Sequence, residues 1–321
     1  MPNQNKKIRS CQKPLYRIQN WSAYEKALIQ RGSITFWLSD DLEKIWCHAG
    51  EKQRGAQFTY SDQAILIMLT VKEVFHLTHR EVEGFMRSLF RLLHIPLTVP
   101  DHSTLSKRGQ TLNVKLPKKA HGRLNIVLDS TGMKIYGEGE WKVRTHGASK
   151  RRTWRKLHVG VDPQSGELQA AVLTENSISD DEMAETLFQQ IEHPIAALAA
   201  DGSYDKRKVY ASLHAHSPDA RVLIPPRKNA HIWQHGNTRT ERLKRDENLR
   251  FIRQHGRANW KRESGYHMRS LAETAMFRMK TLFGEHLSAR LLETQTTQAM
   301  IRCAALNRMA HLGMPQSYKL V

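Results

Sequence analysis

Two short apolar runs, each ending in an aspartate, constrain the fold of this chain more than any other feature. LNIVLDST (residues 124–131) contains Asp129, and IAALAADGSYD (residues 195–205) contains Asp201. Apolar runs of this length are typical of buried strands. An aspartate at a strand end is usually a turn former or a helix cap, so each one alone is weak support for a site. Ligands also collect beyond the strand ends of open α/β sheets, which makes the pair a candidate site.

Strand and helix patterns alternate around these two runs. TWRKLHVGVD and ELQAAVLTE flank PQSG, a turn signal, and predict a hairpin over residues 153–175. Helical spacing follows at 178–193 and 206–216, and ARVLIPPRK (220–228) predicts a strand that its two prolines stop. Residues 229–264 are polar and basic with few apolar anchors, and we expect an irregular insertion there. The order predicts an α/β fold with a mixed sheet flanked by helices.

The N-terminal part of the chain has a different texture. YSDQAILIMLTVKEVF (60–75) and THREVEGFMRSLFRLL (78–93) both have helical apolar spacing. We therefore expect residues 1–120 to form an all-α domain and residues 121–321 to form a second domain, which is α/β.

A short basic segment follows these helices. After Pro100, residues 103–111 can form a polar helix that carries Lys107 and Arg108. Helix, tight connection and short basic helix are typical of a helix-turn-helix, in which these two side chains would contact DNA. The alternative is a plain helical bundle whose last helix is exposed.

The charge of the chain indicates its partner. The formal net charge is +19, and an excess of this size is typical of proteins that bind nucleic acid. Residues 142–161 contain seven Lys/Arg and no acid, and residues 227–269 contain twelve Lys/Arg against four acids. Within the first of these runs we expect DNA contacts from Arg151, Arg152, Arg155 and Lys156.

Other compositional signals exclude several protein classes. The three cysteines are far apart in sequence, which indicates neither a disulfide framework nor a zinc site. The longest apolar run, AILIMLTV (64–71), is too short to span a bilayer. We expect a cytoplasmic protein associated with the nucleoid.

The segment YHMRSLAETAMFRMK (266–280) contains a polar stripe within an otherwise apolar helix. Tyr266, Arg269, Glu273 and Lys280 fall within an arc of ~60° on an ideal helix, and the opposite side is apolar core. This stripe needs an explanation that core packing does not supply.

Two explanations of Glu273 compete. Ser270 and Glu273 have the spacing of a capping box, which would make the glutamate structural. Alternatively, Glu273 joins Asp129 and Asp201, so that three carboxylates converge from three separate elements. Carboxylate oxygens are the ligands that hard cations such as Mg²⁺ prefer, and two such ions can catalyse displacement at a phosphate.

The Tyr-Arg-Glu-Lys spacing of this stripe resembles the signature of bacterial insertion-sequence DDE transposases, and the similarity is greatest to insertion-sequence family five. LDSTGMKIYGEGEW (128–141) and ADGSYD (200–205) resemble the surroundings of that family's first and second catalytic aspartates. The resemblance extends over most of the chain.

This resemblance implies an RNase H-like catalytic core. It implies that Asp129, Asp201 and Glu273 are catalytic and hold two Mg²⁺ ions, for which Mn²⁺ can substitute. The implied activity is metal-dependent DNA cleavage and strand transfer.

It also implies the DNA partners. The residues matching Tyr266, Arg269 and Lys280 contact phosphates near the cleaved transposon end in this family. The implied partners are double-stranded DNA, as terminal inverted repeats and target, and a second copy of the chain, as a dimer on DNA.

Two alternative functions and one step of the reaction stay open at this point. A transposase-derived regulator would bind DNA without catalysis, and a hydrolytic nuclease of the same fold would cleave without joining a 3′-hydroxyl to new DNA. The short spacing between Asp201 and Glu273 also leaves open whether the second strand is cut through a hairpin.

Overall fold

The structure is a computed structural model that describes residues 16–38, 41–50, 55, 57–135, 154–235 and 243–320. Its elements follow the chain as β1 (Tyr16–Ile18), α1 (Trp21–Arg31), α2 (Ile34–Trp37), α3 (Leu42–Trp46), α4 (Asp62–Val74), α5 (His79–Leu92), α6 (His102–Arg108), β2 (Leu124–Ile135), β3 (Trp154–Val161), β4 (Leu168–Glu175), η1 (Asp180–Met183), α8 (Ala184–Gln189), β5 (Ile195–Ala199), η2 (Gly202–Tyr204), α9 (Arg207–His216), β6 (Arg221–Leu223), α10 (Lys244–His255), α11 (Arg257–Ser264), η3 (Tyr266–Arg269), α12 (Ser270–Phe283), β7 (His286–Leu287), α13 (Leu292–Leu312) and β8 (Ser317–Lys319). Among these residues, no helix has the length and apolar character needed to cross a membrane.

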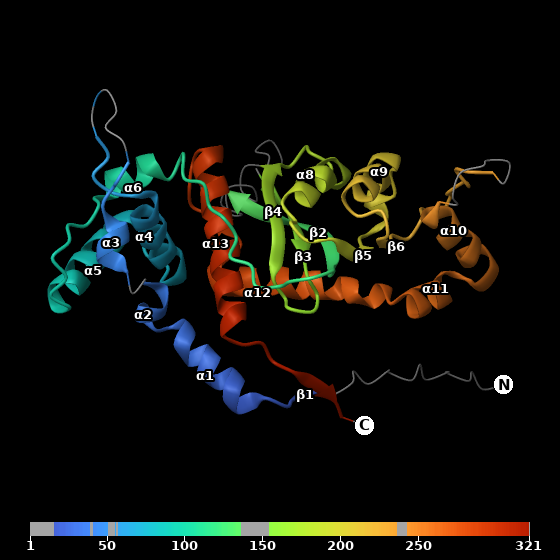
Figure 1. Ribbon diagram of the computed structural model, residues 1–321, viewed down its shortest axis with the longest axis horizontal. Coiled ribbons are helices and arrows are strands. Elements are labelled where there is room, and N and C mark those ends of the chain that lie inside the picture. The colour runs from blue at the N-terminus through green and yellow to red at the C-terminus, as the bar shows by residue number, and fades with distance from the viewer. Residues whose placement is uncertain are drawn as a thin grey trace, which may run out of the picture.

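A mixed sheet lies at the centre of the molecule (Figure 1). Its strand order in the described chain is β4-β3-β2-β5-β6, and β7 pairs with the end of β2. The strands β2, β3 and β4 are antiparallel neighbours, whereas β5 and β6 run parallel to β2. The expected hairpin is confirmed as β3 and β4, and the two apolar runs are confirmed as β2 and β5. The expectation that Asp129 ends its strand was wrong, because β2 continues through Asp129 to Ile135, where it still pairs with β3 and then with β7. The α/β class with a mixed sheet is therefore confirmed.

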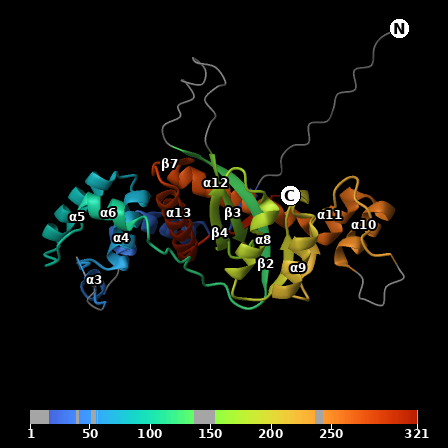
Figure 2. The same cartoon turned by 90° about the horizontal axis from the view of Figure 1, so that it is seen from above.

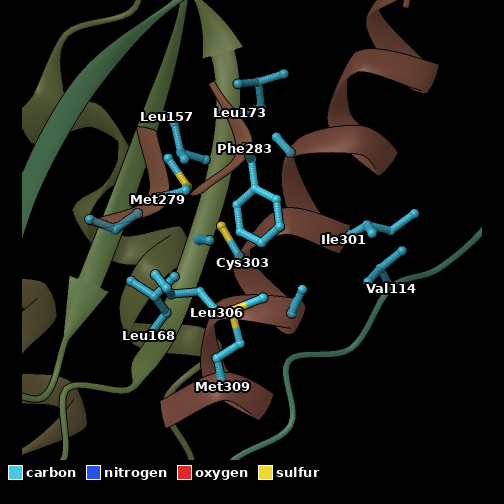
Figure 3. Packing of buried hydrophobic residues seen from close by; sticks show 14 of the residues in the cluster. Val114, Leu157, Leu168, Leu173, Met279, Phe283, Ile301, Cys303, Leu306 and Met309 are labelled. Atoms are coloured by element: carbon cyan, nitrogen blue, oxygen red, sulfur yellow. The ribbon is translucent and has the colours of Figure 1, made fainter. Parts of the chain in front are cut away.

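Helices cover both faces of this sheet. Helices α8 and α9 pack on one face, where they bury Ile126 and Leu128 of β2. Helices α12 and α13 pack on the other face, against Val127 of the same strand. Figure 3 shows this second layer, in which Phe283 of α12 lies close to Cys303 of α13. The alternation along β2 follows the two-residue period of a strand.

The N-terminal helices begin at the residues that the sequence indicates. Ser61 accepts a hydrogen bond from the N–H three residues on, and Asp101 does the same for α6. Thr78 and Glu81 form a complete capping box at the start of α5. The helices α4, α5 and α6 lie at one end of the molecule, and α10 and α11 lie at the other (Figure 2). Their action as a helix-turn-helix stays a prediction.

The N-terminal region is not purely helical, and it is not packed separately. Strand β1 pairs antiparallel with β8 from the opposite end of the sequence, which corrects the expectation of an all-α region. A three-residue strand is too short to leave a periodic signal in the sequence. The buried side chains of α4 and α5 also belong to the same hydrophobic cluster as those of β3 and α13. A boundary at residue 120 stays a prediction, and the core is continuous across it.

The segment 229–264 was expected to be irregular, and this expectation was wrong. It contains α10 and α11. Apolar periodicity failed as a signal because the anchors of α10 are charged. Arg245 is 3% exposed, pairs with Asp205 at 2.9 Å and with Asp246 at 3.0 Å, and lies 3.9 Å from the ring centroid of Trp233.

A buried polar network joins α4 to α13. The carboxylate of Glu73 accepts hydrogen bonds from Lys72 at 2.6 Å, from Arg302 at 2.7 Å and from Gln298 at 3.0 Å. Arg302 also donates to two backbone carbonyls of the segment that follows α12. The side chains of Lys72, Glu73 and Arg302 are all less than 10% exposed. The network therefore connects three parts of the fold that are far apart in sequence.

We expect removal of one member of this network to destabilise the fold strongly, because the remaining charges stay buried without a partner. Glu73→Ala leaves Lys72 and Arg302 buried without their carboxylate, and such a loss typically costs ~3–5 kcal/mol. Urea titration should show a decrease of this size in the free energy of unfolding. Asp41→Ala, which breaks an exposed pair with Lys44 at 2.8 Å, should cost less than ~1 kcal/mol. Equal losses in the two variants would contradict the role assigned to the network.

The same carboxylate should make stability depend on pH. Burial raises the pKa of Glu73, but the charges and hydrogen bonds of Lys72 and Arg302 lower it more, so it lies below its usual 4.5. A depressed folded-state pKa stabilises the fold above the unfolded pKa, and this contribution is lost as the pH falls through the folded-state value. We expect urea titrations from pH 5 downwards to show a steeper loss for the wild type than for Glu73→Gln. An equal loss of stability in the wild type and Glu73→Gln would show that the pKa of Glu73 is the same in the folded and unfolded states.

Candidate active site

Asp129 lies in the middle of the sheet, on the face that α12 covers. It is two residues beyond Val127 on β2, so the strand alternation directs both side chains to the same face. Its side chain is 16% exposed and accepts a hydrogen bond from the N–H of Ser130 at 3.0 Å. Burial raises the pKa of Asp129, and the nearby carboxylates of Asp201 and Glu273 raise it further, against the opposing effect of Arg269. This carboxylate therefore lies in an environment that disfavours its charge.

Asp201 comes to the same place through strand pairing. Val127 of β2 is the register partner of Ala199 on the parallel strand β5. Asp129 follows Val127 by two residues and Asp201 follows Ala199 by two, so the parallel pairing brings the two aspartates side by side, Asp129 within β2 and Asp201 just beyond the end of β5. Asp201 caps η2, where it accepts a hydrogen bond from the N–H of Ser203 at 2.8 Å and another from the Ser203 hydroxyl.

Glu273 lies in the first turn of α12 and is held by Arg269. Nη1 of Arg269 is 2.8 Å from Oε1 of Glu273, and Nη2 of the same side chain is 3.6 Å from Oδ2 of Asp129. The guanidinium thus bridges two carboxylates from different elements. The capping-box alternative is wrong, because α12 has no side-chain cap and the Ser270 hydroxyl donates to the carbonyl of His267 at 2.9 Å.

Tyr266 lies beside this group but outside the α-helix. Residues 266–269 form the 3₁₀ turn η3, and α12 begins at Ser270, so the polar stripe is not on one continuous helix. Tyr266 is 9% exposed, and its ring centroid is 5.4 Å from that of Trp260. Burial raises the pKa of Tyr266, and the charges of Asp201 and Asp129 are close enough to raise it as well.

Lys280 is not part of the carboxylate group. It follows Glu273 by seven residues on α12, which corresponds to ~10 Å along the helix. Its charge acts instead on Glu285, whose pKa is lowered by a hydrogen bond from Lys134 and, to a smaller extent, by Lys280. Lys280 therefore extends the basic surface along α12 away from the acids.

The other side chains predicted to contact DNA differ in their exposure to solvent and in their existing partners. Lys107 on α6 is exposed. Arg108 is 11% exposed on its side chain, pairs with Asp62 at 2.5 Å and lies 4.0 Å from the ring centroid of Phe58. Arg151 and Arg152 lie outside the described residues.

Arg155 and Lys156 alternate across β3 and contact opposite layers. Arg155 donates to Gln295 of α13 at 2.8 Å, and Lys156 donates to the carbonyl of Ile178 at 2.8 Å and pairs with Asp180 at 3.2 Å. Both cations thus have structural partners, and their contact with DNA stays a prediction.

One buried residue near the acids, Tyr204, was not predicted from the sequence. Tyr204 of η2 is 1% exposed, and its hydroxyl has no hydrogen-bond partner within the described part of the chain. Burial raises its pKa strongly, and the carboxylates of Asp180, Asp129 and Asp201 add to this effect. Its place three residues after Asp201 is the only signal that links it to the site.

The donor set fits a hard cation in chemistry, although its present arrangement is not a closed ligand set. Asp129, Asp201 and Glu273 supply only oxygen ligands, as Mg²⁺ or Mn²⁺ prefers. Across the described residues, no group of three or more His, Cys, Asp or Glu side chains is positioned to hold a metal ion as it stands. The guanidinium of Arg269 lies between Asp129 and Glu273 and pairs with both.

Two solved structures of DNA transposases are similar to this chain. The piggyBac transposase synaptic complex with hairpin DNA has 11% sequence identity and a TM-score of 0.43, over 87% of this chain and 75% of that chain. The Drosophila P element transposase strand transfer complex has 12% identity and a TM-score of 0.31, over 89% of this chain and 86% of that chain. Both TM-scores are below 0.5, so neither structure decides the fold or the site.

Sequence comparison is more decisive. Two family models described as "Transposase DDE domain" match the chain, one over residues 29–138 and the other over residues 120–308. The second match covers more than half of the 321 residues and contains Asp129, Asp201 and Glu273. The chain therefore belongs to the DDE transposase family.

Proposed function

We propose that this transposase serves an insertion sequence of family five, binds the terminal inverted repeats of that element, and performs metal-dependent DNA cleavage and strand transfer. One observation supports this most: Asp129 and Asp201 meet through parallel strand pairing, and Arg269 ties Glu273 to Asp129 across the same face. Three carboxylates from three elements, within a chain of net charge +19, suit chemistry on a polyanion.

The strand arrangement is consistent with an RNase H-like core. Three antiparallel strands are followed by two that run parallel to the first, and helices cover both faces. In this core, β2 carries the first acid, the end of β5 carries the second, and α12 carries the third.

Asp129, Asp201 and Glu273 would hold two Mg²⁺ ions, which when bound supply activation of the attacking hydroxyl and stabilisation of the leaving oxygen. Arg269 pairs with two of these carboxylates, Asp129 and Glu273, and offsets one of their two charges. We propose that the guanidinium of Arg269 leaves these carboxylates and pairs with a DNA phosphate when the acids bind cations. A guanidinium pairs with phosphate as well as with carboxylate.

The remaining cations would position the DNA. Lys280 lies along α12 from the acids, and exposed Lys107 lies on α6 in the helix-turn-helix-like segment. We propose that the first contacts phosphates near the cleaved end and that the second contributes to recognition of the terminal repeats. A dimer on DNA, with one end bound by each copy, would bring two ends together.

The carboxylate assignment has a direct test. Asp129→Asn, Asp201→Asn and Glu273→Gln keep the side-chain shape but remove the charge that a hard cation requires. We expect Mg²⁺-dependent nicking of a terminal-repeat duplex to fall by several orders of magnitude in each variant, with DNA binding retained. Glu185→Gln, an exposed change on α8 across the sheet, is the matched control and should cleave normally. Substantial cleavage by Glu273→Gln would remove that residue from the centre.

Strand transfer separates a transposase reaction from a nuclease reaction. The same assay should therefore contain a target duplex, and joined 3′-ends should form with the wild type. Hydrolysis without any joined product would favour a nuclease.

Arg269 and Lys280 should differ in their effects on metal binding. Each replacement by alanine should weaken binding of the cleaved end by ~1–3 kcal/mol, through loss of a charge-assisted phosphate contact. Arg269→Ala should also tighten Mn²⁺ binding in calorimetry without DNA, because it removes a cation from Asp129 and Glu273. Lys280→Ala should leave Mn²⁺ affinity unchanged, since Lys280 does not couple to these acids. Wild-type DNA affinity in both variants would refute the phosphate-facing assignment.

A further inference from the structure

A second polar pocket lies away from the carboxylates, where the N-terminal helices meet the start of α13. It has a volume of about 410 Å³ and is lined by α4, α6 and the segment between β7 and α13. Its polar lining contains one carboxylate, that of Glu73, among side chains that can donate hydrogen bonds, which include Lys72, Ser106, Gln110, Arg290 and Thr294.

The buried charges at this pocket, which Lys72 and Glu73 line and Arg302 contacts from outside the lining, do not balance. Lys72 and Arg302 are two cations that share one carboxylate, Glu73. All three side chains are less than 10% exposed, so the cluster has a formal excess of one positive charge in a region of low dielectric. An anion beside the cluster would offset this excess.

Lys72 is the group through which an anion would bind. It lines the pocket, and Glu73 is its one hydrogen-bond partner within the described residues. An ammonium group has three N–H donors. Nearby His79 stays neutral at pH 7, because burial and the charge of Lys72 lower its pKa to about 4. Exposed Arg290 supplies a second full charge at the rim of the pocket.

Along the chain, α12 leads from the active site towards the segment that lines the pocket. Glu273 is near the start of α12, Lys280 follows, and the helix ends at Phe283 before β7 and the pocket segment. The helix rises ~15 Å between Glu273 and Phe283. Because successive phosphates of one DNA strand are ~3.4 Å apart along the axis, this length spans roughly four nucleotides or more.

We propose that this pocket binds a backbone phosphate of the terminal DNA, several nucleotides from the reacting phosphate, through Lys72 with Arg290 at its rim. This inference rests on the proposed DNA transposase function. A phosphate seated here contacts α4, α6 and the start of α13 together, so DNA binding strengthens the junction of the N-terminal helices with the core.

The test uses the full-length protein and a labelled duplex ending in the terminal repeat of the element. Binding is measured over a range of KCl concentrations for the wild type, Lys72→Met, Lys72→Arg and Arg290→Gln. Lys44→Met is the matched control, because it removes one charge from an exposed lysine on α3. Lys72→Met keeps the Glu73–Arg302 pair, so we expect it to fold, and Arg290→Gln tests the same pocket through an exposed residue.

We expect the slope of log affinity against log salt to become shallower by about 0.9 in Lys72→Met and in Arg290→Gln, which corresponds to one lost phosphate contact. Lys72→Arg and Lys44→Met should keep the wild-type slope. Inorganic phosphate should raise the unfolding temperature of the wild type more than KCl of equal ionic strength does, and this effect should be lost in Lys72→Met.

Three results would overturn the inference. One is that Lys72→Met and Arg290→Gln keep the wild-type slope of log affinity against log salt while the wild type still cleaves terminal DNA. This result would refute phosphate binding in the pocket and leave the proposed function intact. Another is an equal change of slope in Lys44→Met, which would show that the slope depends only on the net charge of the protein. The third is that Lys72→Met loses the stabilisation by inorganic phosphate but keeps the wild-type salt dependence of DNA binding. The pocket would then be a site for a free anion and not for DNA. A wild type that neither binds nor cleaves terminal DNA would instead refute the proposed function.

Discussion

Helix α13 is buried on most of its circumference, and the two halves of the molecule depend on this packing. A helix between two layers lacks a solvent-facing side, so its polar side chains must find partners inside the protein. Asn307 exchanges hydrogen bonds with the backbone of Leu168 on β4, at 2.8 and 2.9 Å. Arg302 and Gln298 meet Glu73 of α4 instead. Because these polar contacts are directional, they fix the placement of α13 against both layers more narrowly than apolar packing alone.

The charges of the active site follow from opposing requirements. A protein that binds DNA needs excess positive charge, whereas its chemistry needs a cluster of negative charge. Burial is the main cause of the raised pKa of Asp129, and repulsion from the carboxylates of Asp201 and Glu273 adds to it. Arg269 offsets this repulsion from within the site, because it pairs with Asp129 and Glu273 at once. The same cation can serve a phosphate when other cations neutralise the acids.

Helix α12 connects the active site with the junction of the N-terminal helices. Its first turn carries Glu273, its apolar side packs Met279 and Phe283 into the core, and its end leads to the segment that Arg302 holds. A helix fixed at both ends transmits position well, since a packed core resists small displacements. Helix α12 therefore connects the acids with the junction through packed structure.

The sequence by itself determined the local elements and the identities of the acids. Short apolar runs predicted β2 and β5, helical apolar spacing predicted α4 and α5, and Asp129, Asp201 and Glu273 were identified from these runs and from a polar stripe. It missed α10, because buried ion pairs such as Arg245 with Asp205 leave no apolar period. Only the tertiary structure decided that Arg269 bridges two acids, that Tyr204 lies beside them, and that Lys72 and Arg302 share one carboxylate. These contacts join residues that are distant in sequence, and local patterns carry no information about which distant charges are brought together.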